Sequence, residues 1–151
     1  MDITVVIEGF KAMPMIELTA PAGSLTEAGR KSVQRDLATL LLKWEGAPDN
    51  DFFRSVAWTY LHELPEGAQT TALDDAPRFR VDVTVPAGAL SDRRKAGLIQ
   101  EATALVLEAA GLRESDAIRV WVLIHEQPEG TWGAGGQVVK IAELREIAEQ
   151  G

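Results

Sequence analysis

The feature that most constrains the fold is an internal repeat. The hexapeptide PAGSLT at residues 21–26 returns as PAGALS at residues 86–91, 65 positions later. A second hexapeptide, HELPEG at residues 62–67, returns as HEQPEG at residues 125–130, 63 positions later. Two matched segments in the same order indicate two copies of one structural unit, whose registers differ by a two-residue gap.

Each copy shows the pattern of a strand, a turn, a long helix and a second strand. Apolar residues alternate with polar ones from Phe79 to Val85, which predicts a half-buried strand, and residues 15–20 form a weaker counterpart. Thr26 and Ser91 are suitable N-caps for the two helices. The helices are predicted to end at glycines and to present one apolar face each. These glycines are Gly46 and Gly111.

The second strands are predicted over residues 52–61 and 118–124, and the latter is apolar enough for a buried central strand. A right-handed crossover makes the strands of one unit parallel. The expected fold is therefore α+β: two tandem β-α-β units, residues 14–76 and 77–151, forming a four-stranded mixed sheet with both helices on one face. Residues 1–13 form an N-terminal extension.

The other face of this sheet also needs a cover. A helix predicted over residues 138–148 is too small to cover that face of the sheet. The glycines at 133, 135 and 136 predict a tight hairpin before this helix. We therefore expect a closed homo-oligomer. The alternation in residues 3–7 also predicts a short strand in the extension.

Composition excludes several classes of function. The net charge of -8 opposes binding to a nucleic-acid backbone, and no apolar run approaches the roughly 18 residues of a membrane span. The chain has no cysteine, which excludes disulfides and thiolate chemistry. Neither a metal site nor a cofactor is expected. The start lacks the basic region of a secretory signal, which favours a cytoplasmic protein.

The second unit ends in a sequence that resembles 4-oxalocrotonate tautomerase. This resemblance rests on the segment IRV at residues 118–120, on Glu126 and on GTWGAGG at residues 130–136. The first unit, from PMI at residues 14–16 onward, is similar in spacing to fused relatives such as cis-3-chloroacrylic acid dehalogenase. The resemblance implies the tautomerase/MIF-like fold and a homotrimer with active sites between units.

The resemblance also implies the chemistry. In that family an amino-terminal proline transfers protons, arginines hold the substrate carboxylate and an aromatic residue lines the pocket. Pro14 matches the proline, Arg119 the arginine and Trp132 the aromatic residue. Arg54, as the repeat-mate of Arg119, and Arg80 are further candidates for binding a small anionic substrate. The implied activity is keto-enol tautomerisation of a small 2-oxo or unsaturated carboxylic acid.

Three departures from the family pattern limit this interpretation. The histidine, tyrosine and paired arginines that the dehalogenase uses have no evident match here, so that reaction is not expected. Thirteen residues precede Pro14, and within a chain its nitrogen is an amide that cannot act as a base. Ser24 stands where the family has another arginine. Because Met13 directly precedes Pro14, initiation there and methionine removal would expose the amine. The alternative is a tautomerase-fold homo-oligomer without proline-based catalysis, which serves as a binding or structural protein.

Other polar residues permit two interpretations. His62 and His125 occupy repeated positions before a Pro-Glu-Gly turn, where turn chemistry is favoured over a metal or acid-base role. Arg119 on an apolar strand must be paired or functional, so it is either a ligand-binding residue or part of a subunit ion pair. Arg78 and Arg80 flank Phe79 and could reach an anion.

Overall fold

The protein is described by a computed structural model, which places residues 14–139. Four strands form one sheet in the order β2-β1-β3-β4. The two strands of each unit pair in parallel, and β1 pairs with β3 in antiparallel orientation. The predicted α+β fold with a four-stranded mixed sheet is therefore confirmed. The strands are β1 (Met15–Pro21), β2 (Trp58–Leu64), β3 (Phe79–Pro86) and β4 (Val120–Gln127).

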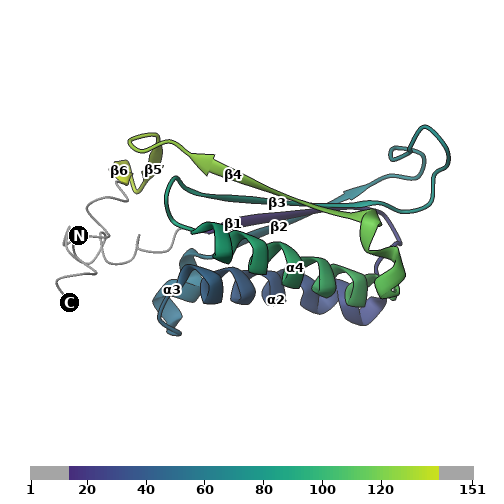
Figure 1. Ribbon diagram of the computed structural model, residues 1–151, viewed down its shortest axis with the longest axis horizontal. Helices are drawn as coiled ribbons and strands as arrows, with labels where there is room; N and C mark the ends of the chain where they lie inside the picture. Colours follow the sequence, from purple (N-terminus) through teal and green to yellow (C-terminus); the bar gives the residue numbers. More distant parts are fainter. Residues whose placement is uncertain (1–13, 140–151) are drawn as a thin grey trace.

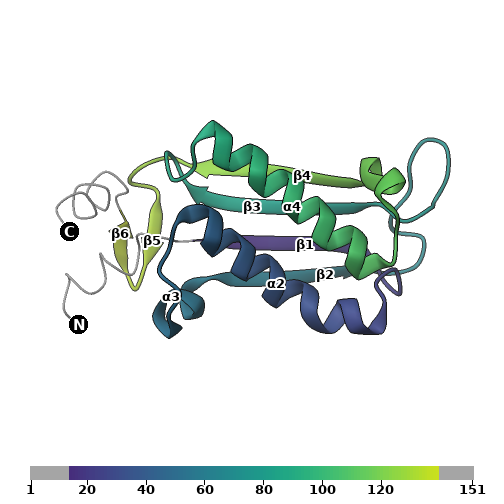
Figure 2. The ribbon, with the colours of Figure 1, turned by 60° about the horizontal axis from the view of Figure 1, so that its bottom comes forward.

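Both long helices, α2 (Glu27–Glu45) and α4 (Asp92–Ala110), lie on the same face of this sheet (Figures 1 and 2). The core lies between the sheet and these helices, and its most buried side chains are branched aliphatic residues from both layers. None of the helices within residues 14–139 is long and apolar enough to cross a membrane. The largest fully buried side chains include Ile16, Leu18, Leu37, Leu41, Val81, Val83 and Leu98.

The predicted helix ends are confirmed. The Thr26 side chain accepts a hydrogen bond from the backbone N–H of Gly29, and Ser91 accepts one from Arg94. Each helix ends at a glycine in the left-handed region, Gly46 at φ 73° and Gly111 at φ 65°. Only glycine adopts this conformation without a steric penalty, so the sequence determines both helix ends.

The predicted second strands began too early. Residues 51–56 form a short helix, α3 (Asp51–Val56), because the Asn50 side chain caps it and Phe53 is buried against Leu42. In the second unit, a 3-10 helix, η1 (Glu114–Arg119), occupies the corresponding place. The paired strands β2 and β4 follow these helices.

Strand β4 was predicted to be a buried central strand, and this prediction is wrong. β2 and β4 are the two edges of the sheet, because the antiparallel pairing of β1 with β3 joins the units at the centre. Val122 and Ile124 on β4 pack against the core, so Trp121 and Leu123, which alternate with them, are exposed on the face without helices. The apolar character of β4 therefore does not serve the core of this chain alone.

The glycine-rich segment forms the expected hairpin, with β5 (Trp132–Ala134) antiparallel to β6 (Gln137–Val139). Gly135 and Gly136 both have positive φ and form its turn. The helix predicted from residue 138 does not begin there, because residues 138 and 139 belong to β6. The remainder of that predicted helix and the predicted strand at residues 3–7 lie outside the described residues.

Candidate active site

A pocket of about 490 Å³ lies where β1 begins, next to the β5–β6 hairpin. It brings together Pro14 and Trp132, the two residues that the sequence associated with proton transfer and a pocket wall. We name it the first pocket. Its lining is largely apolar, and none of its described lining residues carries a charge. The lining residues are Pro14, Met15, Val56, Trp58, Thr84, Gln127, Thr131, Trp132, Gly133, Ala134 and Gly135.

Pro14 is held at the first pocket by its own backbone. The Pro14 carbonyl oxygen accepts a hydrogen bond from the N–H of Trp58 at 3.2 Å, which begins the pairing of β1 with β2. The residue is buried. In the chain of 151 residues, its nitrogen belongs to the peptide bond with Met13 and has no available lone pair. The structure therefore positions a proline here, whereas its basicity depends on a free amino terminus.

A second pocket, of about 350 Å³, contains the predicted arginines Arg80 and Arg119. A third arginine, Arg78, also lines it. The arginines come from β3, from the end of η1 and from the segment that precedes β3. The other lining residues are Thr19, Leu64, Gln69, Thr70, Thr71, Phe79, Ile118 and Trp121.

The two pockets are related by the internal repeat. With the strand registers as guide, nine of the eleven residues that line the first pocket have a counterpart that lines the second, and Thr131 and Gly135 do not. The most consequential replacements are Phe79 in place of Pro14 and Arg119 in place of Val56. The further counterparts are Arg80 for Met15, Trp121 for Trp58, Thr19 for Thr84, Leu64 for Gln127, and Gln69, Thr70 and Thr71 for Trp132, Gly133 and Ala134.

The two pockets lie at opposite ends of the sheet. Met15 pairs with Thr84 at one end of the antiparallel β1–β3 ladder, and Thr19 pairs with Arg80 towards the other. A strand of this length spans roughly 20 Å, which exceeds the reach of an arginine side chain and a small ligand. Within one chain, Arg80 and Arg119 therefore do not contact a small molecule bound beside Pro14.

Arg54 lines neither pocket. It lies on α3 with an exposed side chain that forms ion pairs with Asp49 and Asp51. The sequence offset of 65 suggested Arg54 as the mate of Arg119, but the strand registers make Val56 the residue of the first unit that is equivalent to Arg119. The two-residue gap between the repeats falls before β2 and β4 and accounts for this shift.

His62 and His125 take part in strand pairing rather than in the turns. Both lie on edge strands and contact carboxylates on the neighbouring strands: His62 Nε2 is 2.9 Å from Glu17 Oε1, and His125 Nε2 is 2.8 Å from Asp82 Oδ1. These are equivalent pairs of the two units. Within residues 14–139 no group of three or more His, Asp or Glu side chains could hold a metal ion.

Asp82 forms hydrogen bonds with two side chains, whereas Glu17 forms one with His62. Arg80 Nε donates a hydrogen bond to Asp82 at 2.8 Å, on the side opposite to His125. Partial burial alone would raise the pKa of Asp82, but the hydrogen bonds and charges of His125 and Arg80 outweigh burial and lower it. Asp82 therefore remains ionised and holds Arg80 at the rim of the second pocket.

Sequence analysis did not single out Gln69. It lies in the segment after β2, and its Oε1 accepts a hydrogen bond from the backbone N–H of Arg78 at 2.9 Å. The signal that could have found it is the repeat, because Gln69 occupies the place that Trp132 has in the second unit. Glutamine and tryptophan share no side-chain property that would reveal the equivalence without the strand register.

Comparison with known families concerns mainly the second unit. Residues 80–142 match the family model described as tautomerase enzyme. The second unit is therefore similar to tautomerases. The repeat and the shared strand order extend the same architecture to the first unit, so the chain has the fold of a fused tautomerase. No curated protein matches the chain by sequence.

Solved structures support this assignment of the fold. The tautomerase-like chain superposes on N1, a member of the cis-3-chloroacrylic acid dehalogenase family, with a TM-score of 0.70 at 21% identity, covering 91% of this chain and 92% of that one. Pt0534, solved after inactivation by 2-oxo-3-pentynoate, gives 0.70 at 22% identity and 85% and 98% coverage. The F6 fused 4-OT, an asymmetric trimer, gives 0.69 at 20% identity and 86% and 98% coverage.

Proposed function

We propose that this protein is a tautomerase-like isomerase that interconverts the keto and enol forms of a small 2-oxo or unsaturated carboxylic acid at the first pocket. The observation that carries the proposal is that Pro14, at the start of β1, shares this pocket with Trp132. The match to the tautomerase family model supports the reaction class. The proposal concerns the form of the chain in which Pro14 is the free amino terminus.

The chemistry needs one group that both accepts and returns a proton. The secondary amine of a terminal Pro14 would remove a proton from the carbon next to the substrate carbonyl and return it at another position of the conjugated system. An unperturbed terminal amine titrates near 7.7 to 8.0, and an apolar pocket lowers that value by disfavouring the charged form. Such an amine is a proton carrier at neutral pH.

The substrate carboxylate needs a cationic partner, and the described lining of the first pocket contains none. Arg119 and Arg80 are our proposed carboxylate ligands, with Arg54 as a third candidate. Because the arginines of the second pocket lie at the far end of the sheet, they could act on a substrate at Pro14 only from another copy of the chain. A homotrimer would allow this, and the trimeric fused 4-OT neighbour supports it.

The test compares two forms of the protein. A chain that begins at Pro14, produced by initiation at Met13 and removal of that methionine, is expected to accelerate ketonisation of the enol of a small 2-oxo acid. Loss of the ultraviolet absorbance of the enol measures the rate. The chain that begins at Met1 is the matched control, and Pro14→Ala in the shorter chain should lower kcat/KM by at least about tenfold. Equal rates for the two lengths would contradict a role for the proline amine.

A second candidate function rests on the place of Pro14 within the chain. Where residues 1–13 are retained, the Pro14 nitrogen is an amide and the residue is buried. That form would be a tautomerase-fold homo-oligomer without proline-based catalysis, serving as a binding or structural protein. Intact mass of the protein from its native cell separates the two forms. The whole chain of 151 residues has a mass of 16.4 kDa, so the loss of thirteen residues is readily resolved.

A further inference from the structure

Both histidines of the chain lie on the same face of the sheet. The chain has two histidines, at equivalent positions of the repeated hexapeptides. Leu61 and Ile124, which directly precede them, pack against the core, so His62 and His125 point to the face without helices (Figure 1). We name this face the open face. Any charge change of a histidine side chain in this protein therefore takes place there.

Each histidine contacts a carboxylate of the adjacent central strand. His62 Nε2 lies 2.9 Å from Glu17 Oε1, and His125 Nε2 lies 2.8 Å from Asp82 Oδ1. The side chains of Glu17 and Asp82 are 30% and 16% exposed. These two acidic residues are also direct partners in the antiparallel β1–β3 ladder. Like charges that face each other across two strands destabilise a sheet, and a protonated histidine beside each carboxylate would offset that repulsion.

One arginine is a permanent cation in this cluster. Arg80 Nε donates a hydrogen bond to Asp82 Oδ2 at 2.8 Å, and an arginine keeps its charge throughout the neutral range. In the described part of the chain, no arginine or lysine forms an ion pair with Glu17, whose charged contact is His62. Tyr60 stacks on His62 with ring centroids 6.3 Å apart. While the imidazoles are neutral, the two carboxylates therefore outnumber the cations of the cluster, and protonation of both histidines reverses that balance.

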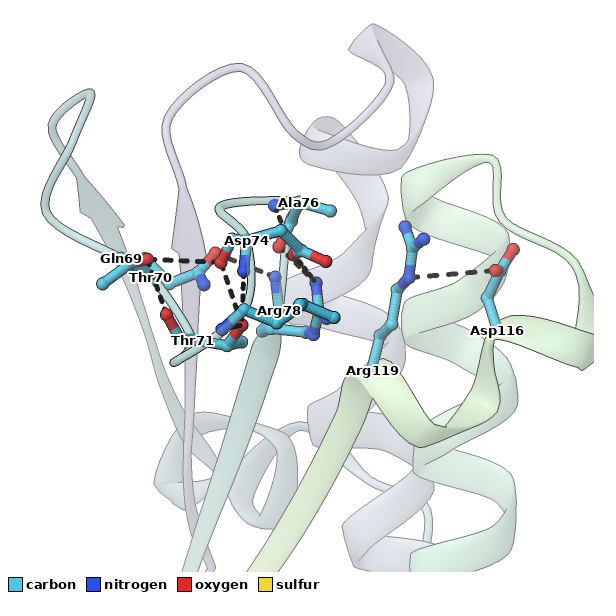
Figure 3. Close-up of polar contacts among 9 residues, drawn as sticks. Gln69, Thr70, Thr71, Asp74, Ala76, Arg78, Asp116 and Arg119 are labelled. Atoms are coloured by element: carbon cyan, nitrogen blue, oxygen red, sulfur yellow. Dashed lines mark hydrogen bonds and ion pairs between the residues drawn. The ribbon is translucent and has the colours of Figure 1, made fainter.

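Two further arginines lie beside Arg80, but their carboxylate partners are outside the cluster. Arg78 and Arg119 line the same pocket as Arg80. Figure 3 shows that Arg78 faces Asp74 and that Arg119 faces Asp116, with nitrogen–oxygen distances of 3.2 and 3.8 Å. Neither of these carboxylates is on the sheet. The balance of charge in the cluster therefore depends on Arg80 and on the two histidines.

Apolar side chains flank the cluster on both edges of the sheet. The strand registers place Tyr60, Glu17, Asp82 and Leu123 in one row across the open face, with the two carboxylates at its centre. A second copy that covers the apolar ends of this row also removes water from its centre. A carboxylate without a compensating charge opposes such burial, whereas a pair of imidazolium and carboxylate carries no net charge. Association through this face therefore favours the protonated histidines.

We propose that His62 and His125 make self-association of this protein pH-dependent: their protonated forms neutralise Glu17 and Asp82 and favour the assembly, and their neutral forms weaken it. Histidine is the side chain whose ordinary charge change falls near neutral pH. Because association takes up protons, it strengthens as the pH falls through this range and weakens as the pH rises. This inference rests on the homotrimer of the proposed function but not on the chemistry of Pro14.

The test is sedimentation velocity of the chain of 151 residues over a dilution series, at about pH 6 and at about pH 8. The measured quantity is the concentration at which half of the chains are assembled. We expect this concentration to be at least about tenfold higher at the higher pH, because each proton taken up on association changes the association constant by up to about tenfold per pH unit.

Replacing both histidines isolates their contribution. The double variant His62→Gln/His125→Gln keeps a neutral donor beside each carboxylate and cannot be protonated, so at both pH values it should assemble as the unmodified protein does at the higher pH. Asp36→Asn, exposed on α2, changes the net charge outside the open face and should keep the full pH dependence. Glu45, whose pKa burial raises to about 8, titrates equally in these proteins, so the comparison cancels its effect. Circular dichroism establishes that each variant is folded.

A second comparison tests the pairing of histidine with carboxylate. His125→Gln alone leaves the pair of His62 and Glu17 intact and should keep part of the pH dependence. Adding Glu17→Gln to that variant removes the partner of His62, so a protonated imidazole would then be buried without a carboxylate. Assembly of this double variant should no longer weaken as the pH rises.

Four outcomes would overturn the proposal. A protein that is monomeric at both pH values, or assembled at every dilution at both, would show that these residues do not control assembly. An equal half-assembly concentration at the two pH values would do the same. Full pH dependence in the variant without histidines would assign the effect to other groups. None of these results depends on the rate measured for the chain that begins at Pro14, so the isomerase proposal fails or stands separately.

Discussion

At the scale of single residues, Glu45 carries a carboxyl group in an unfavourable environment. It ends α2, and both of its carboxylate oxygens are buried without a hydrogen-bond partner among residues 14–139. Burial raises the pKa of this carboxyl from 4.5 to about 8. Between those values the folded protein keeps the proton and the unfolded chain loses it, so Glu45 lowers the free energy of unfolding as pH rises.

Glu45→Gln should therefore stabilise the protein in a pH-dependent manner. At pH 8 we expect the free energy of unfolding to increase by about 4 kcal/mol, and at pH 5 by less than about 1 kcal/mol, because the unfolded carboxyl is then only partly ionised. Urea unfolding at the two pH values measures the difference. Glu108→Gln, at an exposed position of α4, should have no such pH dependence. The same gain at both pH values would contradict a buried neutral carboxyl.

Asp82 makes the opposite contribution. The lowered pKa of Asp82 means that its ionised form is favoured in the folded protein. Asp82 therefore stabilises the protein above the ordinary aspartate pKa, and this stabilisation is lost as the pH falls through the lowered value. Asp82→Asn should lower the free energy of unfolding by about 1 kcal/mol at pH 7, and the difference should vanish in acid. Asp36→Asn, exposed on α2, is the control for loss of one charge. A deficit that persists in acid would point to packing instead.

At the scale of the elements, the close crossing of α2 and α4 depends on Gly29. A Cβ at this position would lie 2.2 Å from the carbonyl oxygen of Ala109, a backbone atom that cannot move freely. The same oxygen accepts hydrogen bonds from the N–H and the hydroxyl of Thr26, at 2.9 and 3.2 Å. The start of α2 is therefore attached to the end of α4.

Gly29→Ala tests this crossing. Helix propensity alone favours alanine by roughly 0.5–1 kcal/mol, but the overlap with Ala109 should dominate and produce a net loss of about 1–3 kcal/mol in stability. Thermal and urea unfolding measure the change. Ser32→Ala on the exposed side of the same helix should stay within about 0.5 kcal/mol of the unmodified protein. A stabilised Gly29→Ala variant would show that the helices do not approach as closely as the structure indicates.

At the scale of the whole molecule, the sheet has one covered and one open face (Figure 1). Alternate residues of the two edge strands leave large apolar side chains on the open face: Trp58, Tyr60, Trp121 and Leu123 are 59%, 45%, 65% and 38% exposed. Large apolar side chains exposed in pairs on each edge strand mark candidate protein interfaces. The exposed aromatic and aliphatic residues on both edges are the physical basis for expecting a homotrimer.

Leu123→Glu should therefore weaken self-association. A buried charge without a partner at an interface costs several kcal/mol, so the variant should shift towards monomer at micromolar concentration. Size-exclusion chromatography with light scattering gives the mass of each species. Leu73→Glu introduces the same charge at a position that is 89% exposed in the loop after β2, and it should leave the oligomer intact. A monomeric unmodified protein would remove the basis of this prediction.

Much of the fold could be predicted because its determinants are local or periodic. Thr26, Ser91 and the two terminal glycines mark the long helices through backbone hydrogen bonding and φ, and the alternation of β3 shows directly in the residues. Helix α3 was missed because an apolar run of its length suits strand or helix equally. Its assignment depends on the Asn50 cap and on burial of Phe53 against Leu42. The roles of the site residues stay predictions, and residues expected to act together lie in two different pockets of one chain.

The sequence by itself determined that there are two β-α-β units, where their helices begin and end, and which residue types are available for chemistry, because these properties follow from repeats and from neighbours along the chain. Only the tertiary structure decided which of those residues meet. Antiparallel pairing of β1 with β3 sends Pro14 and Trp132 to one end of the sheet and Arg80 and Arg119 to the other, and it makes β4 an edge. Strand order and register depend on contacts between residues far apart in the chain, and hydrophobic periodicity does not encode them.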